Sequence, residues 1–106
     1  MNLEQYNENN LYRFREFYIP AYMMEIIKRY INYGIQPGNF LSAVIQNKSL
    51  RECIERADDI NMANLPAYVA FFVNEVPSNC WGSEVRFCNY INSTRFCNYI
   101  NSRPEL

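Results

Sequence analysis

The residues best suited to bind a ligand are arginines and tyrosines near the N-terminus. Arg13, Arg15 and Tyr18 lie close together in the sequence, with Tyr12 and Tyr22 on either side. An arginine guanidinium binds phosphate through two parallel hydrogen bonds, and an aromatic ring stacks on a base or faces a cation. We therefore predict a ligand-binding strip formed by Arg13, Arg15, Tyr18 and Tyr22. The alternative is that these residues form an ordinary solvent-exposed face that binds no ligand.

A second candidate cluster combines a cation, a carboxylate and an amide. Asp58 and Asn61 are three residues apart, so a helix would place them on one surface close to Arg56. Such a group binds a polar ligand or, as the structural alternative, caps and pairs within its own helices. Trp81 is the third candidate. It lies in a compact loop, near Asn74-Glu75, and we expect its ring to cover the core.

The sequence lacks the residues that most enzymes use for catalysis. There is no histidine, so imidazole zinc ligands, His-based triads and His acid–base chemistry are excluded. P-loop, GxGxxG and GxSxG motifs are absent. The acidic pairs Asp58-Asp59 and Glu52/Glu55 lack a third convergent carboxylate for a divalent cation. We expect no catalytic residue, no metal and no cofactor. The four cysteines show no CxxC spacing: Cys53, Cys80, Cys88 and Cys97.

Length and composition are those of one small globular domain. The chain has 106 residues, 49% of them hydrophobic, and a formal charge of −1. This charge argues against generic binding to nucleic acid or acidic membranes. The first residues do not resemble a signal peptide, and no apolar run approaches the roughly 18 residues of a membrane span. We therefore expect a cytoplasmic protein with reduced thiols.

The strongest structural signals flank a bend at Pro37-Gly38. A helix is predicted from Pro20 to Tyr33, ended by Gly34 in the left-handed conformation. A short apolar helix then begins at Asn39 and is predicted to form the centre of the core. Its large side chains fall on one broad stripe: Phe40, Leu41, Val44 and Ile45.

Further helices are predicted on both sides of this centre. Ser49 and Glu52 form a capping box. The stretch Asp58–Asn64 either continues that helix or forms a second start, with Asp58 or Asn61 as the cap. Pro66 fits the first turn of a helix that ends before Pro77. This helix is apolar nearly all round, so we expect it to be packed on several sides. Ser83 caps the last helix. Residues 1–10 are expected to be a loose polar arm, and Leu11, Phe14 and Tyr18 recur as in a helical turn. The expected fold class is therefore all-α, a single-domain bundle of about four to five short helices over residues 11–92.

The sequence RFCNYIN occurs twice, at Arg86–Asn92 and Arg95–Asn101. In a continuous helix, a nine-residue shift rotates the second copy by half a turn, so we expect a break near Ser93-Thr94. The extension, residues 93–106, has three interpretations. It is an accident of replication slippage or a remnant of cloning, a cover for an apolar patch on a partner subunit, or a competitor of the first copy for one groove.

The pattern of residues 18–91 resembles a family of small uncharacterised proteins encoded by bacteriophages and prophages. This resemblance implies a phage or mobile-element source and a helical fold, and it implies no known reaction. It is carried by Ile19-Pro20, Arg29-Tyr30, Gly34, Pro37-Gly38, Phe40-Leu41, Ala43-Val44, Asn47, Leu50, Ala57-Asp58, Asn61, Asn74-Glu75, Pro77 and Cys80-Trp-Gly-Ser83.

From these observations we expect a non-enzymatic phage-type binding protein that antagonises host defence. Two modes are open: sequestering a nucleotide signal in an Arg/Tyr-lined pocket between subunits of a homo-oligomer, or covering a host protein directly. A structural or regulatory protein-interaction module in phage development is the alternative. The candidate binding residues are Arg13, Arg15, Tyr18, Tyr22, Arg56, Asp58, Asn61 and Trp81.

Overall fold

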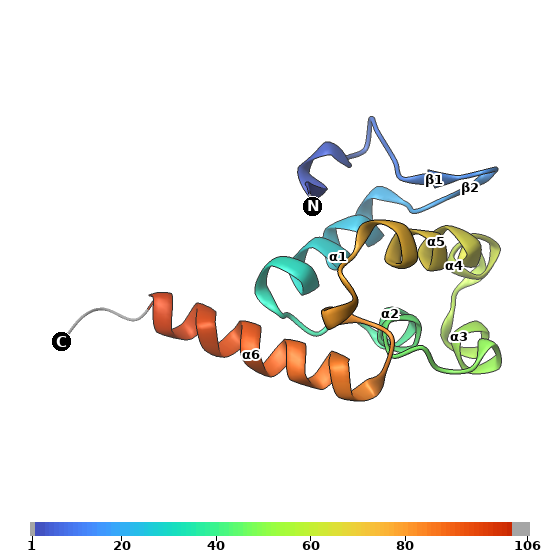
Figure 1. Ribbon diagram of the computed structural model, residues 1–106. Helices are drawn as coiled ribbons and strands as arrows, with labels where there is room; N and C mark the ends of the chain where they lie inside the picture. The colour runs from blue at the N-terminus through green and yellow to red at the C-terminus, as the bar shows by residue number, and fades with distance from the viewer. Residues whose placement is uncertain (1, 103–106) are drawn as a thin grey trace.

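Six short helices form the body of the protein in a computed structural model that describes residues 2–102, with side chains through Thr94. The predicted all-α single-domain bundle is confirmed, with one or two helices more than expected. A small β-ribbon and α6 lie on opposite sides of the bundle (Figure 1). In chain order the elements are the 3-10 helix η1 (Leu3–Gln5), β1 (Arg13–Phe14), β2 (Phe17–Tyr18), α1 (Ala21–Tyr33), α2 (Asn39–Ile45), α3 (Leu50–Arg56), α4 (Asp59–Ala63), α5 (Leu65–Glu75), the 3-10 helix η2 (Ser78–Cys80) and α6 (Glu84–Ser102).

The bend between α1 and α2 forms as the sequence predicts. Gly34 has a φ of 66°, and its amide donates to the carbonyls of Arg29 and Tyr30, which ends α1. Pro37 is buried in the turn. The four apolar side chains predicted as the centre of the core are all buried in α2: Phe40, Leu41, Val44 and Ile45.

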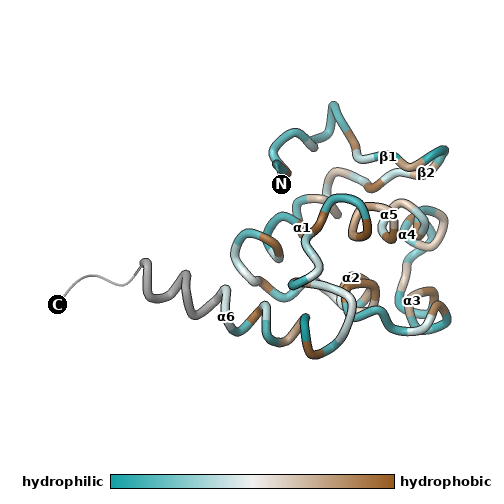
Figure 2. The backbone as a smooth tube through the Cα atoms, in the orientation of Figure 1, coloured by the Kyte–Doolittle hydropathy of each residue, from teal (hydrophilic) through white to brown (hydrophobic). Residues whose placement is uncertain are grey.

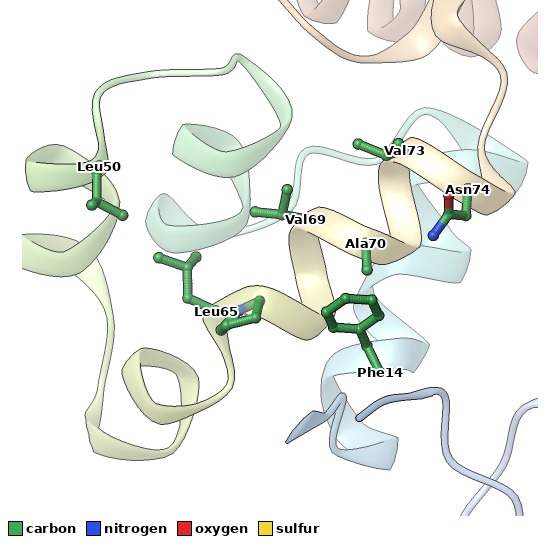
Figure 3. Close-up of a pocket in the computed structure, with 8 residues that line it drawn as sticks. Phe14, Leu50, Leu65, Val69, Ala70, Val73 and Asn74 are labelled. Atoms are coloured by element: carbon green, nitrogen blue, oxygen red, sulfur yellow. The ribbon is translucent and has the colours of Figure 1, made fainter. Parts of the chain in front are cut away.

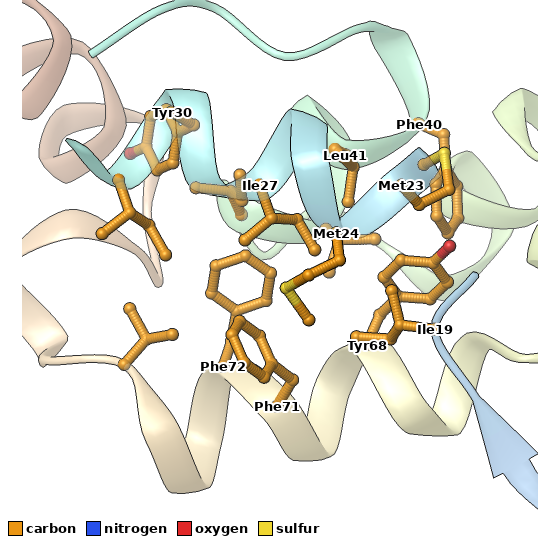
Figure 4. Close-up of a cluster of buried hydrophobic side chains, with 14 of the residues drawn as sticks. Ile19, Met23, Met24, Ile27, Tyr30, Phe40, Leu41, Tyr68, Phe71 and Phe72 are labelled. Atoms are coloured by element: carbon orange, nitrogen blue, oxygen red, sulfur yellow. The ribbon is translucent and has the colours of Figure 1, made fainter. Parts of the chain in front are cut away.

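The core lies between α1, α2 and α5, whose apolar side chains point toward one another (Figure 4). Tyr68, Phe71 and Phe72 project from α5 and are almost completely buried. The Tyr68 ring packs edge-on against Phe40 of α2, with their centroids 5.0 Å apart. Figure 2 shows hydrophobic stretches on the central helices and a mainly hydrophilic N-terminal segment.

Helices α3 and α4 begin at capping residues that the sequence predicts. The Ser49 hydroxyl accepts a hydrogen bond from the Glu52 amide, and the Asp58 carboxylate accepts one from the Asn61 amide. The second of the two alternatives for residues 58–64 is thus correct, because α4 is a separate helix capped by Asp58. Pro66 lies in the first turn of α5, where its missing N–H costs little.

The N-terminal segment packs on the bundle, which differs from the loose arm expected for residues 1–10. Leu3 is buried, and the Tyr6 ring packs against Phe71 with their centroids 6.2 Å apart. The Lys28 ammonium donates to the Tyr6 carbonyl at 2.7 Å. A buried leucine, a ring contact and a long-range hydrogen bond therefore hold this segment, and none of the three leaves a local sequence pattern.

The helical turn predicted around Leu11–Tyr18 is wrong. Residues 13–18 form an antiparallel ribbon in which Arg13 pairs with Tyr18 and Phe14 with Phe17. Arg15 takes a positive φ of 56° in the connecting turn. The Tyr18 amide donates to the Asn64 side chain at 3.0 Å, so contact with α5 stabilises the ribbon and overrides the local helical spacing.

The first RFCNYIN copy holds α6 against α1. Phe87 and Ile91 are buried, Phe87 stacks on Tyr30 at 5.5 Å, and the Tyr90 hydroxyl donates to the Ile31 carbonyl. The break expected at Ser93-Thr94 is absent, since α6 is one helix to Ser102. The side chains of the second copy lie outside the described residues, as do those of residues 102–106.

Candidate functional site

The predicted Arg/Tyr strip is brought together only in part. The Arg13 guanidinium lies 5.8 Å from the centre of the Tyr18 ring, across the β-ribbon. Arg15 is separated from this pair, because its guanidinium lies 5.1 Å from the ring of Phe14 instead. Tyr12 is buried and packs edge-on against Phe71 at 5.1 Å. The two guanidinium groups therefore pack against different rings.

Tyr18 and Asp58 both act electrostatically on Tyr22, near the start of α4. Tyr22 is 52% exposed, and its pKa is raised by partial burial, by the Asp58 carboxylate and by Tyr18. Burial also raises the pKa of Tyr68, with smaller effects of Tyr22, Asp58 and Tyr18. These four side chains thus lie within electrostatic range of one another. Asp58 contributes a carboxylate to this region, which repels a phosphate.

Asn61 is a structural residue. It is 4% exposed, and its side-chain oxygen accepts a hydrogen bond from the Tyr68 hydroxyl at 2.5 Å. Its side-chain nitrogen lies 3.8 Å from the Met23 sulfur, and its backbone amide is capped by Asp58. Asn61 and Asp58 therefore act as the capping alternative describes, and Asn61 presents no surface to a ligand.

Arg56 and Trp81 belong to other parts of the surface. Arg56 pairs with Glu52 on the same helix at 3.5 Å. The Trp81 indole donates to the Val76 carbonyl at 3.2 Å, and its ring lies 6.2 Å from Phe72. The predicted cover over the core is confirmed, at the C-terminal end of α5. Asn61 lies beyond the N-terminal end of α5. Asn61 and Trp81 are therefore at opposite ends of an 11-residue helix that is about 16 Å long.

The shallow depression beside β2 is lined by two carboxylates. It encloses about 410 Å³ between the β-ribbon and α4. Glu16 and Asp59 are both exposed on its lining, next to Tyr18 and Ile60. Anionic side chains at this position disfavour a nucleotide phosphate, so the strip and its nearest depression do not make a nucleotide pocket within one chain.

An apolar groove on α5, larger than the depression beside β2, was not predicted from the sequence. It has a volume of about 480 Å³. Leu50 from α3 and Phe14 from β1 stand on either side of α5 (Figure 3). Between them Val69 and Val73 are 49% and 57% exposed, and Leu50 is 65% exposed. The remaining lining residues are Leu65, Pro66, Ala70 and Asn74.

The expectation that α5 is packed on several sides is therefore only partly correct. Its Tyr68, Phe71 and Phe72 side is buried, whereas Val69 and Val73 face solvent. With Pro66 they form a stripe at i, i+3 and i+7 along the helix. An apolar stripe of this kind on the surface indicates a contact face for another molecule. The spacing of Pro66, Val69 and Val73 shows this stripe in the sequence, but it does not show that the stripe is exposed.

The described cysteines do not form a metal site or a redox pair. Cys53 and Cys80 are buried and Cys88 is exposed, all as free thiols. Burial raises the pKa of Cys80 to about 11. Through Thr94, no three side chains of cysteine, aspartate or glutamate gather closely enough to hold a metal ion.

No protein-family model, curated protein or solved structure matches this chain. The resemblance to phage-encoded proteins therefore stays a prediction. No helix in the described part of the chain combines the length and the apolar character needed to cross a bilayer.

Proposed function

We propose that this chain is a non-enzymatic binding protein that covers a surface of another protein with the apolar groove on α5. The observation that carries the proposal is the grouping of Leu50, Val69 and Val73, three large aliphatic side chains that are each about half exposed or more. Covering them removes apolar surface from water at roughly 25 cal/mol per Å². This driving force for binding comes from aliphatic side chains alone and requires no catalytic group.

The phage-like sequence pattern suggests which protein is covered. We propose a component of host defence against phage, acting in the host cytosol. The alternative, a helper in phage development, uses the same groove and differs only in the identity of the partner. The nucleotide-sequestering version has weaker support, because Arg13 and Arg15 pack against different rings and Glu16 and Asp59 line the nearest depression.

Affinity capture with matched variants tests this function. Wild-type protein, Val73→Glu and Val85→Glu are immobilised and exposed to bacterial lysate, and retained proteins are quantified by mass spectrometry. Val85 is the control because it is 68% exposed on α6, outside the groove. We expect one host protein to be retained by wild type and Val85→Glu and lost with Val73→Glu. Identical retention by all three would refute a role for the groove.

Calorimetry against cyclic and linear nucleotides tests the weaker version in parallel. Under the proposal, no nucleotide gives a heat of binding or a melting shift. A saturable heat that disappears in Arg13→Ala would instead establish the nucleotide version.

A further inference from the structure

The apolar groove continues past α5 toward the start of α3. A second recess of about 200 Å³ shares Leu50, Leu65 and Val69 with the groove. It adds Val44, Asn47, Lys48 and Cys53 to the lining. The continuous surface therefore reaches from Phe14 on the β-ribbon, across the Pro66, Val69 and Val73 stripe, to Lys48.

Cations flank this surface on both sides. The Arg15 guanidinium lies 5.1 Å from the ring of Phe14, which itself lines the groove. Lys48 lines the other side, beside Leu50. The ion pairs of the described residues involve Lys28, Arg51 and Arg56, and neither Arg15 nor Lys48 takes part in one. No acidic residue lines either recess.

We infer that the groove accepts an amphipathic helix of the partner protein whose apolar stripe is flanked by carboxylates, an inference that rests on the proposed function. The helix lies along α5 with its aliphatic side chains between Phe14 and Leu50. Stripes at i, i+3 and i+7 on both helices allow side-chain interdigitation. Carboxylates on the two edges of this helix face Arg15 and Lys48. These charge pairs fix the orientation of the bound helix and select against basic helices. The exposed length of α5 corresponds to about three helical turns.

The charges also argue against two other occupants. In a two-fold dimer through this face, Arg15 and Lys48 of one copy would meet the same cations of the other copy. An anionic membrane would be attracted to these cations, but the chain as a whole carries a charge of −1. The cleft between Phe14 and Leu50 also suits a rod-like helix better than a flat lipid surface.

A pair of designed peptides tests the inference. Both are helices of about 15 residues with the same leucine stripe. One carries glutamate and the other lysine on the flanking positions. Each is titrated to about 1 mM into the full-length protein, and binding is followed by NMR chemical shifts. We expect the acidic peptide to bind at least about tenfold more tightly than the basic one and to weaken as salt is raised.

Charge reversal supplies the decisive control. In Arg15→Glu/Lys48→Glu the preference should invert, so that the basic peptide binds more tightly. Arg29→Glu/Arg86→Glu makes the same change of formal charge at exposed positions that do not line the groove, and the acidic preference should remain. Val73→Glu should abolish binding of both peptides.

Several results would overturn the inference. These are no binding of the acidic peptide, equal binding of both peptides, or a preference that survives the reversal at Arg15 and Lys48. A dimer in light scattering that Val73→Glu dissociates would show a second copy in the groove. Binding to anionic lipid vesicles that displaces the acidic peptide would show a membrane surface. A partner captured through Val73 without any peptide preference would leave the proposed function intact and refute only the helix.

Discussion

The hydrogen bond between Asn61 and Tyr68 provides a direct test of whether Asn61 is structural or ligand-binding. In Asn61→Ala the buried Tyr68 hydroxyl loses its partner, an oxygen 2.5 Å away. An unsatisfied buried group costs about 1–3 kcal/mol. The lost contact of the amide with the Met23 sulfur, at 3.8 Å, adds to this cost. We therefore expect Asn61→Ala to lower the free energy of unfolding by about 2–3 kcal/mol.

A double-mutant cycle separates the hydrogen bond from general packing. Tyr68→Phe should cost about 1 kcal/mol, and the double variant Asn61→Ala/Tyr68→Phe should cost less than the two single changes together, because neither partner then remains unsatisfied. Urea denaturation measures all three, and each kcal/mol corresponds to about 4–8 °C in Tm for a chain of this size. Asn89→Ala, at an exposed position on α6, is the control. Strictly additive costs, or an Asn61→Ala variant as stable as wild type, would refute the structural role.

The remaining predictions concern α6, the bend and the buried thiol. Phe87→Ala should cost about 3–5 kcal/mol in urea denaturation, because Phe87 is buried against Tyr30, whereas Val85→Ala at an exposed position should change stability by less than about 0.5 kcal/mol. Gly34→Ala should cost at least about 1 kcal/mol, since Gly34 has a positive φ. The raised pKa of Cys80 means that the unfolded state loses this proton first. Stability should therefore fall as pH rises from about 9 toward 11, and Cys80→Ala should make that fall smaller, with the part due to the buried tyrosines remaining.

These predictions fail in distinguishable ways. Equal costs for Phe87→Ala and Val85→Ala would contradict the packing of α6 on α1. A stability that is flat up to pH 11 would show that Cys80 titrates alike in both states. Truncation after Asn92 addresses the repeat: unchanged stability and oligomer size would leave only the first of its three interpretations, an accident of slippage or cloning.

The helices around the bend were predictable because their signals are local. Gly34, Ser49 and Asp58 each end or cap a helix through atoms within five residues, so their roles can be read from the sequence. The β-ribbon was not predictable in this way. Its register depends on Asn64, 46 residues from Tyr18, and on the positive φ of Arg15, which no neighbouring residue requires.

The candidate site likewise has features that depend on nearby residues and features that depend on tertiary packing. Sequence reasoning placed Asp58 and Trp81 correctly as a cap and a cover, because each bonds to backbone nearby. It could not place the groove, since α5 is apolar on both its buried and its exposed sides. Which side is covered depends on where α1 and α3 pack, and periodicity alone does not fix that. The exposure of Val69 and Val73 is therefore a property of the tertiary structure.

Methyl NMR of the complex with the captured partner shows directly whether the groove on α5 is the contact surface. The methyl groups of Leu50, Val69 and Val73 are observed in the full-length protein before and after the purified partner is added. We expect these three signals to shift and to become protected from a soluble paramagnetic probe, while the signals of Val85 do not change. Protection confined to α6, or to the aromatic signals of Tyr18 and Tyr22, would contradict this expectation.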